Sequence, residues 1–440
     1  MNNIFPRRIL TLRQQDIIRD LNTGSDRYRY STTKKSDFNF DKIPLTLTEI
    51  NKADLYLKWY DRHRNGMGDA AGVDHICVKD LTRNEVAELM RRIAKEIKSG
   101  TFQPPAMRQV DIRKPDGGTR TLSVPTAAVR IVAGTINHVL QPKIHSHLPL
   151  AYHGNMPRRS TLTLFAEIHR KVRNAPNQYL LQNDVRQAYD NVRLRDTREV
   201  LTQYIPDAPL LDLISKLLTG GNPGKEIGIP QGLALSPTTF HLVLARTLKL
   251  EENTTYPTTA TTLIYADNIV YIGENPEELM KVHDRHGNLL NGAGLRWKVE
   301  NPRMTNLTTD QTELLGCKLA VRNGELKFRY TNEKEGKLKA ELREMTTLTS
   351  PSRNAQSRLR GWCMENSHII GTSETGEILG ILSILTDLYG LKEIRWGKVN
   401  LAISNSRLLW QRLVDTPPGS PIYMPGDNVP PIGDCLDSHV

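Results

Sequence analysis

Two acidic residues stand where a predicted strand ends or turns, and their positions indicate metal chemistry. Asp184 closes the apolar run "YLLQNDV", and Asp267 lies beside Asn268 at the centre of "TTLIYADNIVYIG". The β-forming residues on both sides of Asp267 predict two strands that meet at a tight turn. If the strands of both acids are neighbours in one sheet, the carboxylates meet and can bind Mg²⁺ through hard oxygen ligands. Such a pair of metal ions would activate a 3′-hydroxyl and stabilise a pyrophosphate leaving group.

Two other segments carry side chains that suit a nucleotide. The run "IPQGLALSP" offers Gln231 for a base or sugar, and its Gly232 allows the close approach of a strand. The segment "RKPDGGTR" places Arg113, Lys114 and Arg120 near one hairpin tip, which suits a triphosphate. Taken singly, each feature has an ordinary interpretation as a turn aspartate, a loop before a helix, or solvated surface charge.

The segments around these residues alternate between helical and strand patterns. Apolar periodicity predicts helices from about Leu45 to Lys98, over 126–144, up to about Leu250, over 276–292 and from Thr331 to Val414. Alternating runs on both sides of Pro-Asp-Gly-Gly predict a β-hairpin. Further strands are expected up to Tyr330. This mixture predicts an α+β catalytic body followed by a helical domain.

Length and composition limit the class of protein. The 440 residues, 38% hydrophobic and 24% charged, are typical of a folded soluble protein with two or three packed units. We find no apolar run near the roughly 18 residues that span a bilayer and no secretory signal, so we expect a cytoplasmic location without membrane attachment. The four cysteines form no CxxC pair, which argues against a zinc site. The net charge of +11 favours a polyanionic partner, most often nucleic acid.

Taken together and in order, these segments resemble the reverse transcriptase family, in its group II intron lineage. The segment "KPDGGTRTLSVPTAAVRIVAGTINHVLQP" resembles the fingers, and "LLQNDVRQAYDNV" resembles the first catalytic motif. "IPQGLALSP" is similar to the Pro-Gln-Gly motif, and "YADN" stands where the family has Tyr-x-Asp-Asp. "LLGCKL" resembles the primer-grip turn, and "RLRGWCMENS" falls where the lineage has thumb helices.

The resemblance implies a right-hand polymerase with an α+β fingers and palm and an α-helical thumb. The implied order is an N-terminal extension (1–50), mainly fingers (51–183), mainly palm (184–330), a thumb-like helical domain (331–415) and a Pro/Gly-rich tail (416–440).

The resemblance also implies roles for individual residues. Asp184 and Asp267 would hold two Mg²⁺ ions, with Mn²⁺ as an alternative, helped by the Val185 carbonyl. Tyr189 would lie under the sugar of the incoming nucleotide and exclude a 2′-hydroxyl; core packing is its alternative. The nucleotide pocket would also include Lys114, Arg120, Gln231 and Gly232, with solvated charge as the alternative for Lys114. Nucleic acid would contact Arg158, Arg159, Gly316, Arg358 and Arg360.

Three positions depart from the family pattern. Asn268, counted with the catalytic acids, replaces the second Asp of the hairpin pair. Its amide oxygen still suits a metal, but one negative charge is lost, so we expect activity with an altered metal preference; a weakened or non-polymerising enzyme is the alternative. Asn301 stands where the family carries a Lys, and either Lys298 or Arg303 is available as the cation, so the general acid is unassigned. Asn155 replaces a Phe-Arg pair and indicates a specialised template.

Within the family, the chain most resembles the bacterial defence-associated (antiphage) reverse transcriptases. We expect no HNH endonuclease after the thumb-like region, and Ser236-Pro237 departs from the Ser-Gln of diversity-generating enzymes. The implied activity is RNA-directed DNA synthesis from dNTPs, on a dedicated noncoding RNA, with a cDNA product. A homo-oligomer or a second defence protein would be the further partner. Two alternatives stay open: a group II intron maturase without endonuclease, and a relative that adds nucleotides without a template.

Overall fold

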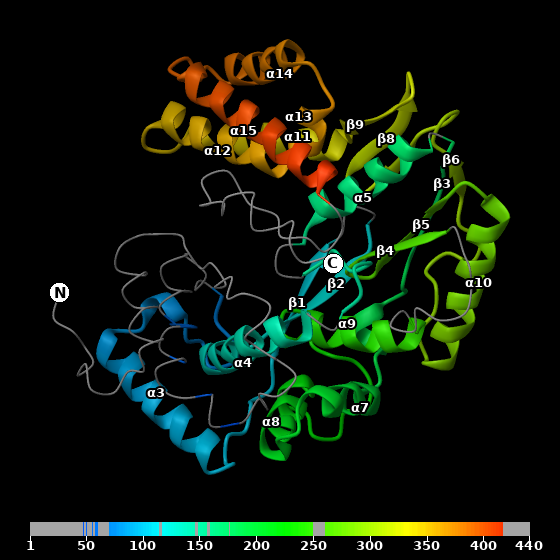
Figure 1. Cartoon of the computed structure of the whole chain (residues 1–440). Helices are drawn as coiled ribbons and strands as arrows, with labels where there is room; N and C mark the ends of the chain where they lie inside the picture. The colour runs from blue at the N-terminus through cyan, green and yellow to red at the C-terminus, as the bar shows by residue number, and fades with distance from the viewer. Residues whose placement is uncertain are drawn as a thin grey trace, which may run out of the picture. The chain divides into compact units, whose positions relative to one another are not determined.

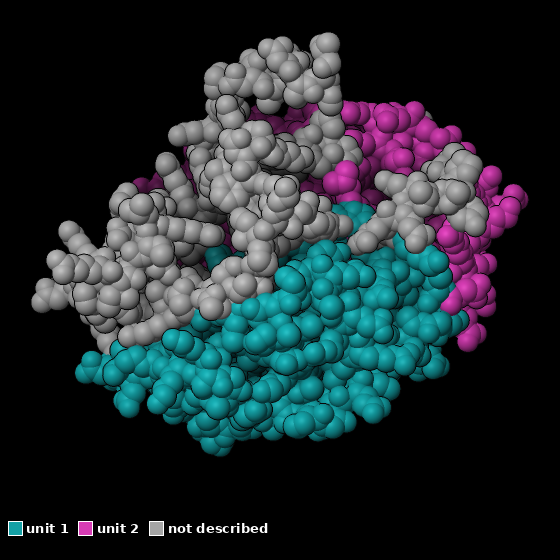
Figure 2. Space-filling view, turned by 60° about the horizontal axis from the view of Figure 1, so that its bottom comes forward, with its two compact units in different colours: residues 1–149, 186–253, 289–296 teal, residues 150–185, 254–288, 297–440 magenta. Residues whose placement is uncertain are grey.

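The chain folds into two compact units, which Figure 2 colours teal and magenta. Unit 1 comprises residues 1–149, 186–253 and 289–296, and unit 2 comprises residues 150–185, 254–288 and 297–440. The structure is a computed structural model, and it describes residues 47, 50, 55, 58–59, 70–113, 117–145, 148–155, 159–175, 177–249 and 260–416. Lys114, Arg158 and nearly all of the predicted N-terminal extension and tail lie outside the described residues.

The described residues of unit 1 form helices and a β-hairpin (Figure 1). Its hairpin joins β1 (Arg108–Arg113) to β2 (Thr119–Val124), with Arg113 opposite Thr119, as the Pro-Asp-Gly-Gly turn predicted. The helical elements described in this unit are η4 (Val78–Asp80), α3 (Arg83–Lys98), α4 (Ala127–His145), α6 (Ala188–Asn191), α7 (Leu194–Tyr204), α8 (Ala208–Leu218) and α9 (Leu235–Leu248).

The helix predicted from about Leu45 to Lys98 is continuous only from Arg83. Residues 70–82 form turns, extended segments and the short helix η4. The reason is local: the Thr82 side chain accepts from the Glu85 backbone, and the Glu85 carboxylate accepts from the Thr82 backbone N–H at 2.7 Å. This reciprocal capping box fixes the first turn of α3 at Arg83.

Unit 2 contains the sheet that carries both acids of the predicted metal site. Its four antiparallel strands lie in the order β4 (Thr261–Tyr265), β5 (Asn268–Gly273), β3 (Tyr179–Asp184) and β6 (Met304–Asn306). Residues 269–272 of β5 are fully buried. This burial agrees with the sequence of β5, because a strand that is covered on both faces reads as a continuous apolar run.

A second sheet and a helical region complete unit 2. The sheet consists of β7 (Thr312–Leu314), β8 (Cys317–Arg322) and β9 (Glu325–Tyr330), all antiparallel. Rings of Phe165, Phe328 and Trp410 pack together and join this sheet to the helices, with Phe165 and Phe328 centroids 5.2 Å apart. The helices described in this unit are α5 (Thr161–Asn174), most of α10 (Pro276–Gly292), α11 (Asn332–Met345), α12 (Pro351–Glu365), α13 (Ser367–Gly371), α14 (Thr375–Leu388) and α15 (Trp396–Asp415).

The described elements confirm the predicted α+β class, with helices and antiparallel sheets followed by a helical region from α11 onward. The fingers, palm and thumb boundaries stay predictions. Across the part of the chain that the structure describes, no helix is both long and apolar enough to cross a membrane.

Candidate active site

The pairing of β3 with β5 places the two predicted acids at one end of the unit 2 sheet. Asp184 lies directly opposite Asn268, and the Val185 N–H donates to the Asp267 carbonyl at 2.9 Å. Tyr265 pairs with Asn268 across a two-residue turn formed by Ala266 and Asp267. Ala266 adopts φ +56°, as the first turn residue does in the hairpin turns that match strand twist. The carboxylate-bearing tip is therefore a tight β-hairpin.

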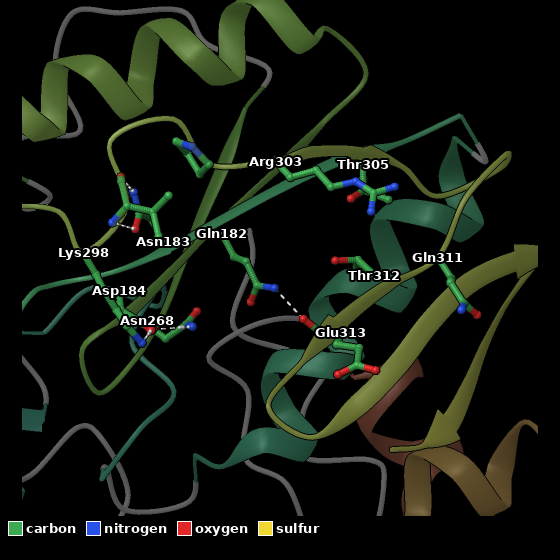
Figure 3. Close-up of a pocket in the computed structure, with 12 residues that line it drawn as sticks. Gln182, Asn183, Asp184, Asn268, Lys298, Arg303, Thr305, Gln311, Thr312 and Glu313 are labelled. Atoms are coloured by element: carbon green, nitrogen blue, oxygen red, sulfur yellow. Dashed lines mark hydrogen bonds and ion pairs between the residues drawn. The ribbon is translucent and has the colours of Figure 1, made fainter. Parts of the chain in front are cut away.

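Two donors hold the Asp184 carboxylate (Figure 3). The Asn268 side-chain Nδ2 donates to Asp184 Oδ1 at 2.8 Å. The Lys298 ammonium Nζ donates to Asp184 Oδ2 at 3.1 Å and forms an ion pair with it. Antiparallel partners point to the same face of a sheet, so the register of β3 and β5 itself brings the amide to the acid.

The backbone beside Lys298 is anchored from the neighbouring position on β3. The Asn183 side chain donates through Nδ2 to the Val299 carbonyl at 2.7 Å and accepts the Val299 N–H through Oδ1 at 3.2 Å. The Lys298 N–H donates to the Asp184 carbonyl at 2.8 Å. His283 of α10 contacts Asn183 Nδ2 at 3.1 Å and stacks on Trp297 at 4.9 Å between ring centroids. These contacts hold the segment on both sides of Lys298.

A pocket of about 490 Å³ opens on the Asp184 side of the sheet (Figure 3). Gln182, on the same face of β3 as Asp184, donates to the Glu313 carbonyl of β7 and forms one wall. Arg303 lines the pocket and is paired with Asp310. The polar lining suits water, metal-bound solvent or a phosphate group more than an apolar ligand.

The donor set beside Asp184 fits a hard divalent cation. Asn268 Oδ1 is buried and has no hydrogen-bond partner, although it adjoins a carboxylate. A buried acceptor of this kind calls for a ligand, and amide and carboxylate oxygens are the ligands that Mg²⁺ takes. No cluster of three or more His, Cys, Asp or Glu side chains that could hold a metal occurs among the described residues. The fit therefore depends on two acids supplemented by amide and carbonyl oxygens.

The other predicted nucleotide residues lie in unit 1 and form a separate group. The Ser123 N–H of β2 donates to the Gln231 carbonyl at 2.7 Å, and the Gln231 side chain donates to Asp190 at 3.2 Å. Gly232 has φ +114°, and a Cβ there would lie 2.6 Å from the Ser123 carbonyl oxygen. The close strand approach expected at Gly232 is thus present.

Tyr189 and Arg120 belong to this unit as well. The Tyr189 ring is half-buried and stacks on Phe240, with centroids 5.2 Å apart and planes 28° apart. Arg120 lies on β2, opposite Ile112, and is exposed. The structure therefore brings Gln231 and Gly232 to the hairpin that carries Arg120. Binding of a nucleotide by this group stays a prediction.

The predicted nucleic-acid residues differ in their surroundings. Arg159 donates to the Tyr152 carbonyl at 2.7 Å, and burial lowers the pKa of its guanidinium. Arg358 pairs with Glu341 at 2.5 Å and with Glu365 at 3.3 Å. Both side chains thus have structural partners, whereas Arg360 is exposed. Gly316 has φ +76° and follows Leu315, also left-handed at +48°, in the β7–β8 turn.

From the sequence, no definite role could be assigned to Lys298, Asn183 or His283. Lys298 was one of two candidate cations, and its contact with Asp184 distinguishes it from Arg303, which pairs with Asp310. Asn183 directly precedes the strand-ending acid, but the sequence holds no signal for its role, which is to hold the Val299 backbone.

Comparisons with known proteins place this geometry in context. Residues 112–319 match the family model described as "Reverse transcriptase (RNA-dependent DNA polymerase)". The putative COX1/OXI3 intron 2 protein of Saccharomyces cerevisiae is 27% identical over 171 residues, which cover 37% of this chain and 20% of that protein. Protein YkfC of Escherichia coli is 25% identical over 189 residues, covering 39% of this chain and 48% of YkfC. The chain therefore spans less than half the length of these relatives.

Among solved structures, a telomerase from Candida albicans, in complex with a fragment of telomeric RNA, is similar with a TM-score of 0.44 and 10% identity. The match covers 75% of this chain and 64% of that one. An apo telomerase from Candida tropicalis is similar with a TM-score of 0.43 and 11% identity, covering 74% and 72% of the two chains.

Proposed function

We propose that this chain is an RNA-directed DNA polymerase that uses dNTPs, because residues 112–319 match the reverse transcriptase family model and the chain is similar to proteins of yeast COX1 introns. The observation that supports this most is the β3–β5 register, which sets Asp184 opposite Asn268 and next to the hairpin tip with Asp267. Two-metal nucleotidyl transfer requires such paired oxygen ligands at one point of a rigid sheet.

Each residue of the unit 2 group has a distinct role in this proposal. Asp184, Asp267 and the Val185 carbonyl would hold Mg²⁺, with Mn²⁺ as the alternative. When bound, the metal would supply Lewis-acid activation of the primer hydroxyl and charge neutralisation at the leaving pyrophosphate. Asn268 orients Asp184 through its 2.8 Å hydrogen bond, and its buried Oδ1, which has no hydrogen-bond partner, would be available as a further oxygen ligand.

The unit 1 group would bind the incoming nucleotide. Gln231 and Gly232, fixed against β2, would contact the base or sugar, and Arg120 with Lys114 would contact the triphosphate. Tyr189 would exclude a 2′-hydroxyl by the position of its ring. Arg360 and the β7–β8 turn at Gly316 would contact the primer and template, together with Arg158, Arg159 and Arg358.

Primer extension on an RNA template tests the activity. With Mg²⁺ and dNTPs, the full chain should extend a DNA primer, and Asp184→Asn or Asp267→Asn should lower the rate by at least about 100-fold. Asp387→Asn, the same chemical change at an exposed position of α14, is the matched control and should retain the rate. Unchanged synthesis by Asp267→Asn would show that the metal-ligand assignment is wrong.

The template and pathway form the finer part of the proposal. We favour a dedicated noncoding RNA and a role in antiphage defence, in the cytoplasm, with a second copy or a second defence protein as partner. A group II intron maturase is the alternative, and the relatives named as intron proteins favour it. Sequencing of RNA that co-purifies with the chain from its native host separates the two: a short noncoding RNA supports defence, and intron sequence supports the maturase.

Addition of nucleotides without a template is a third activity that the same acids would support. Incubation with a primer and dNTPs, with and without complementary RNA, distinguishes it. Extension that depends on the RNA, and whose product sequence matches it, supports the proposed polymerase. Equal extension in its absence would instead identify a template-independent enzyme.

A further inference from the structure

Asp184 has a cationic partner of its own in this chain, and this partner contacts the carboxylate that would bind the metal. The Lys298 ammonium stands 3.1 Å from Asp184 Oδ2, while Asn268 occupies Oδ1. On the basis of the proposed metal site, we infer that Lys298 is a built-in competitor of the divalent cation, which must displace it from Asp184. Lys298 thereby raises the concentration of the divalent cation that the site needs for binding.

The position of Lys298 is fixed by its backbone. Asn183 binds Val299 through both atoms of its side-chain amide, at 2.7 and 3.2 Å, and the Lys298 N–H donates to the Asp184 carbonyl at 2.8 Å. Asn183 is 3% exposed, and His283, 2% exposed, supports it from α10. Buried, reciprocal hydrogen bonds of this kind define one backbone position. The backbone of Lys298 therefore lies beside Asp184 in the folded protein.

The Lys298 side chain, in contrast, is free to withdraw. It is 56% exposed, and the Asp184 side chain is 32% exposed. An ammonium on a flexible four-carbon chain can rotate into water without breaking any of the backbone contacts that anchor it. The pair therefore behaves as a reversible contact and not as part of the core.

The charge of the site makes this competition effective. Asn268 supplies no negative charge, so Asp184 and Asp267 are the acids of the β3–β5 end, and Lys298 offsets one of them. Affinity for a hard divalent cation depends on the number of charged ligands. An exposed ion pair lowers that affinity by up to about fivefold, which corresponds to about 1 kcal/mol.

Direct binding of Mn²⁺ tests this inference without any requirement for polymerisation. The full chain is titrated with MnCl₂ in the absence of nucleotide and primer, and free Mn²⁺ is measured by electron paramagnetic resonance. Lys298→Gln should bind Mn²⁺ about fivefold more tightly than the natural chain. Lys298→Arg keeps the charge and should resemble the natural chain. Arg303→Gln removes a cation of the same pocket that pairs with Asp310, and its affinity should be unchanged.

Asp184→Asn locates the binding site and should abolish the tight Mn²⁺ binding. Equal Mn²⁺ affinities of the natural chain and Lys298→Gln would overturn the inference. An equal increase of the Mn²⁺ affinity in Arg303→Gln would overturn it too, because it would show that the loss of any positive charge in the pocket has the same effect. Retained binding in Asp184→Asn, or no site in any variant, would overturn it as well. A chain that shows the Lys298 effect but makes no DNA would refute the proposed polymerase and leave the competition intact.

Discussion

The Asn268 amide and the Asp184 carboxylate face each other across β5 and β3, with Nδ2 and Oδ1 2.8 Å apart. An Asp at position 268 could not donate this hydrogen bond. The amide therefore stabilises the Asp184 carboxylate in a way that is incompatible with a second acid. The same residue presents a buried oxygen without a partner, so the substitution changes both the resting contacts and the ligand set.

Asn268→Asp should separate these two effects. Without metal, two carboxylates at this distance repel, which should destabilise the protein by about 1–4 kcal/mol at a half-buried site. Millimolar Mg²⁺ should restore the stability, because the metal gains a charged ligand. Thermal unfolding with and without Mg²⁺ measures the difference, and Asn268→Ala, which loses the donor without adding charge, is the control. A loss of stability in Asn268→Asp that Mg²⁺ does not reverse would argue against a metal at this site.

Gly232→Ala should damage the Gln231 loop. A methyl group would lie 2.6 Å from the Ser123 carbonyl oxygen, at a φ of +114° that side chains avoid. We expect a loss of about 2 kcal/mol or more in unfolding free energy, measured by urea denaturation. Gly336→Ala in α11 is the matched control, since a Cβ there meets nothing within 4 Å. It should be neutral or stabilise by up to about 1 kcal/mol.

Much of the fold could be predicted from the sequence because local patterns determine it. Helix α10 has the predicted bounds, and the β4–β5 hairpin follows from an apolar run interrupted by turn residues. The proximity of the two acids also follows from strand ends, provided that β3 and β5 pair. The contact of Lys298 with Asp184 could not be predicted, since it depends on where the chain returns after α10. The role of Asn183 could not be predicted from the sequence either, since it requires Val299 to lie beside it.

Acidification should destabilise the protein below about pH 6.5 through buried histidines. Burial lowers the pKa of His153 to about 3 and the pKa values of His241 and His286 to about 4. These residues are neutral in the folded state, whereas their unfolded forms take up a proton as the pH falls below 6.5, so stability is lost from there down to about pH 4. Each should contribute about 1.4 kcal/mol per pH unit to the slope within that window.

Urea denaturation at pH 7, 6 and 5 measures this slope. His241→Leu removes one of the titrating groups and should make the slope shallower. A stability that is constant between pH 7 and pH 5 would show that these histidines do not remain neutral in the folded protein.

Tyr189→Ala should weaken the discrimination between dNTPs and NTPs. The ring is held by Phe240, with centroids 5.2 Å apart, so its position is fixed before substrate arrives. If this ring excludes the 2′-hydroxyl, its removal should lower the ratio of kcat/KM for a dNTP to that for the matching NTP by about 10- to 100-fold. Single-nucleotide extension with each substrate measures the ratio. Tyr189→Phe retains the ring and should retain the selectivity, whereas an unchanged ratio in Tyr189→Ala would assign Tyr189 to core packing.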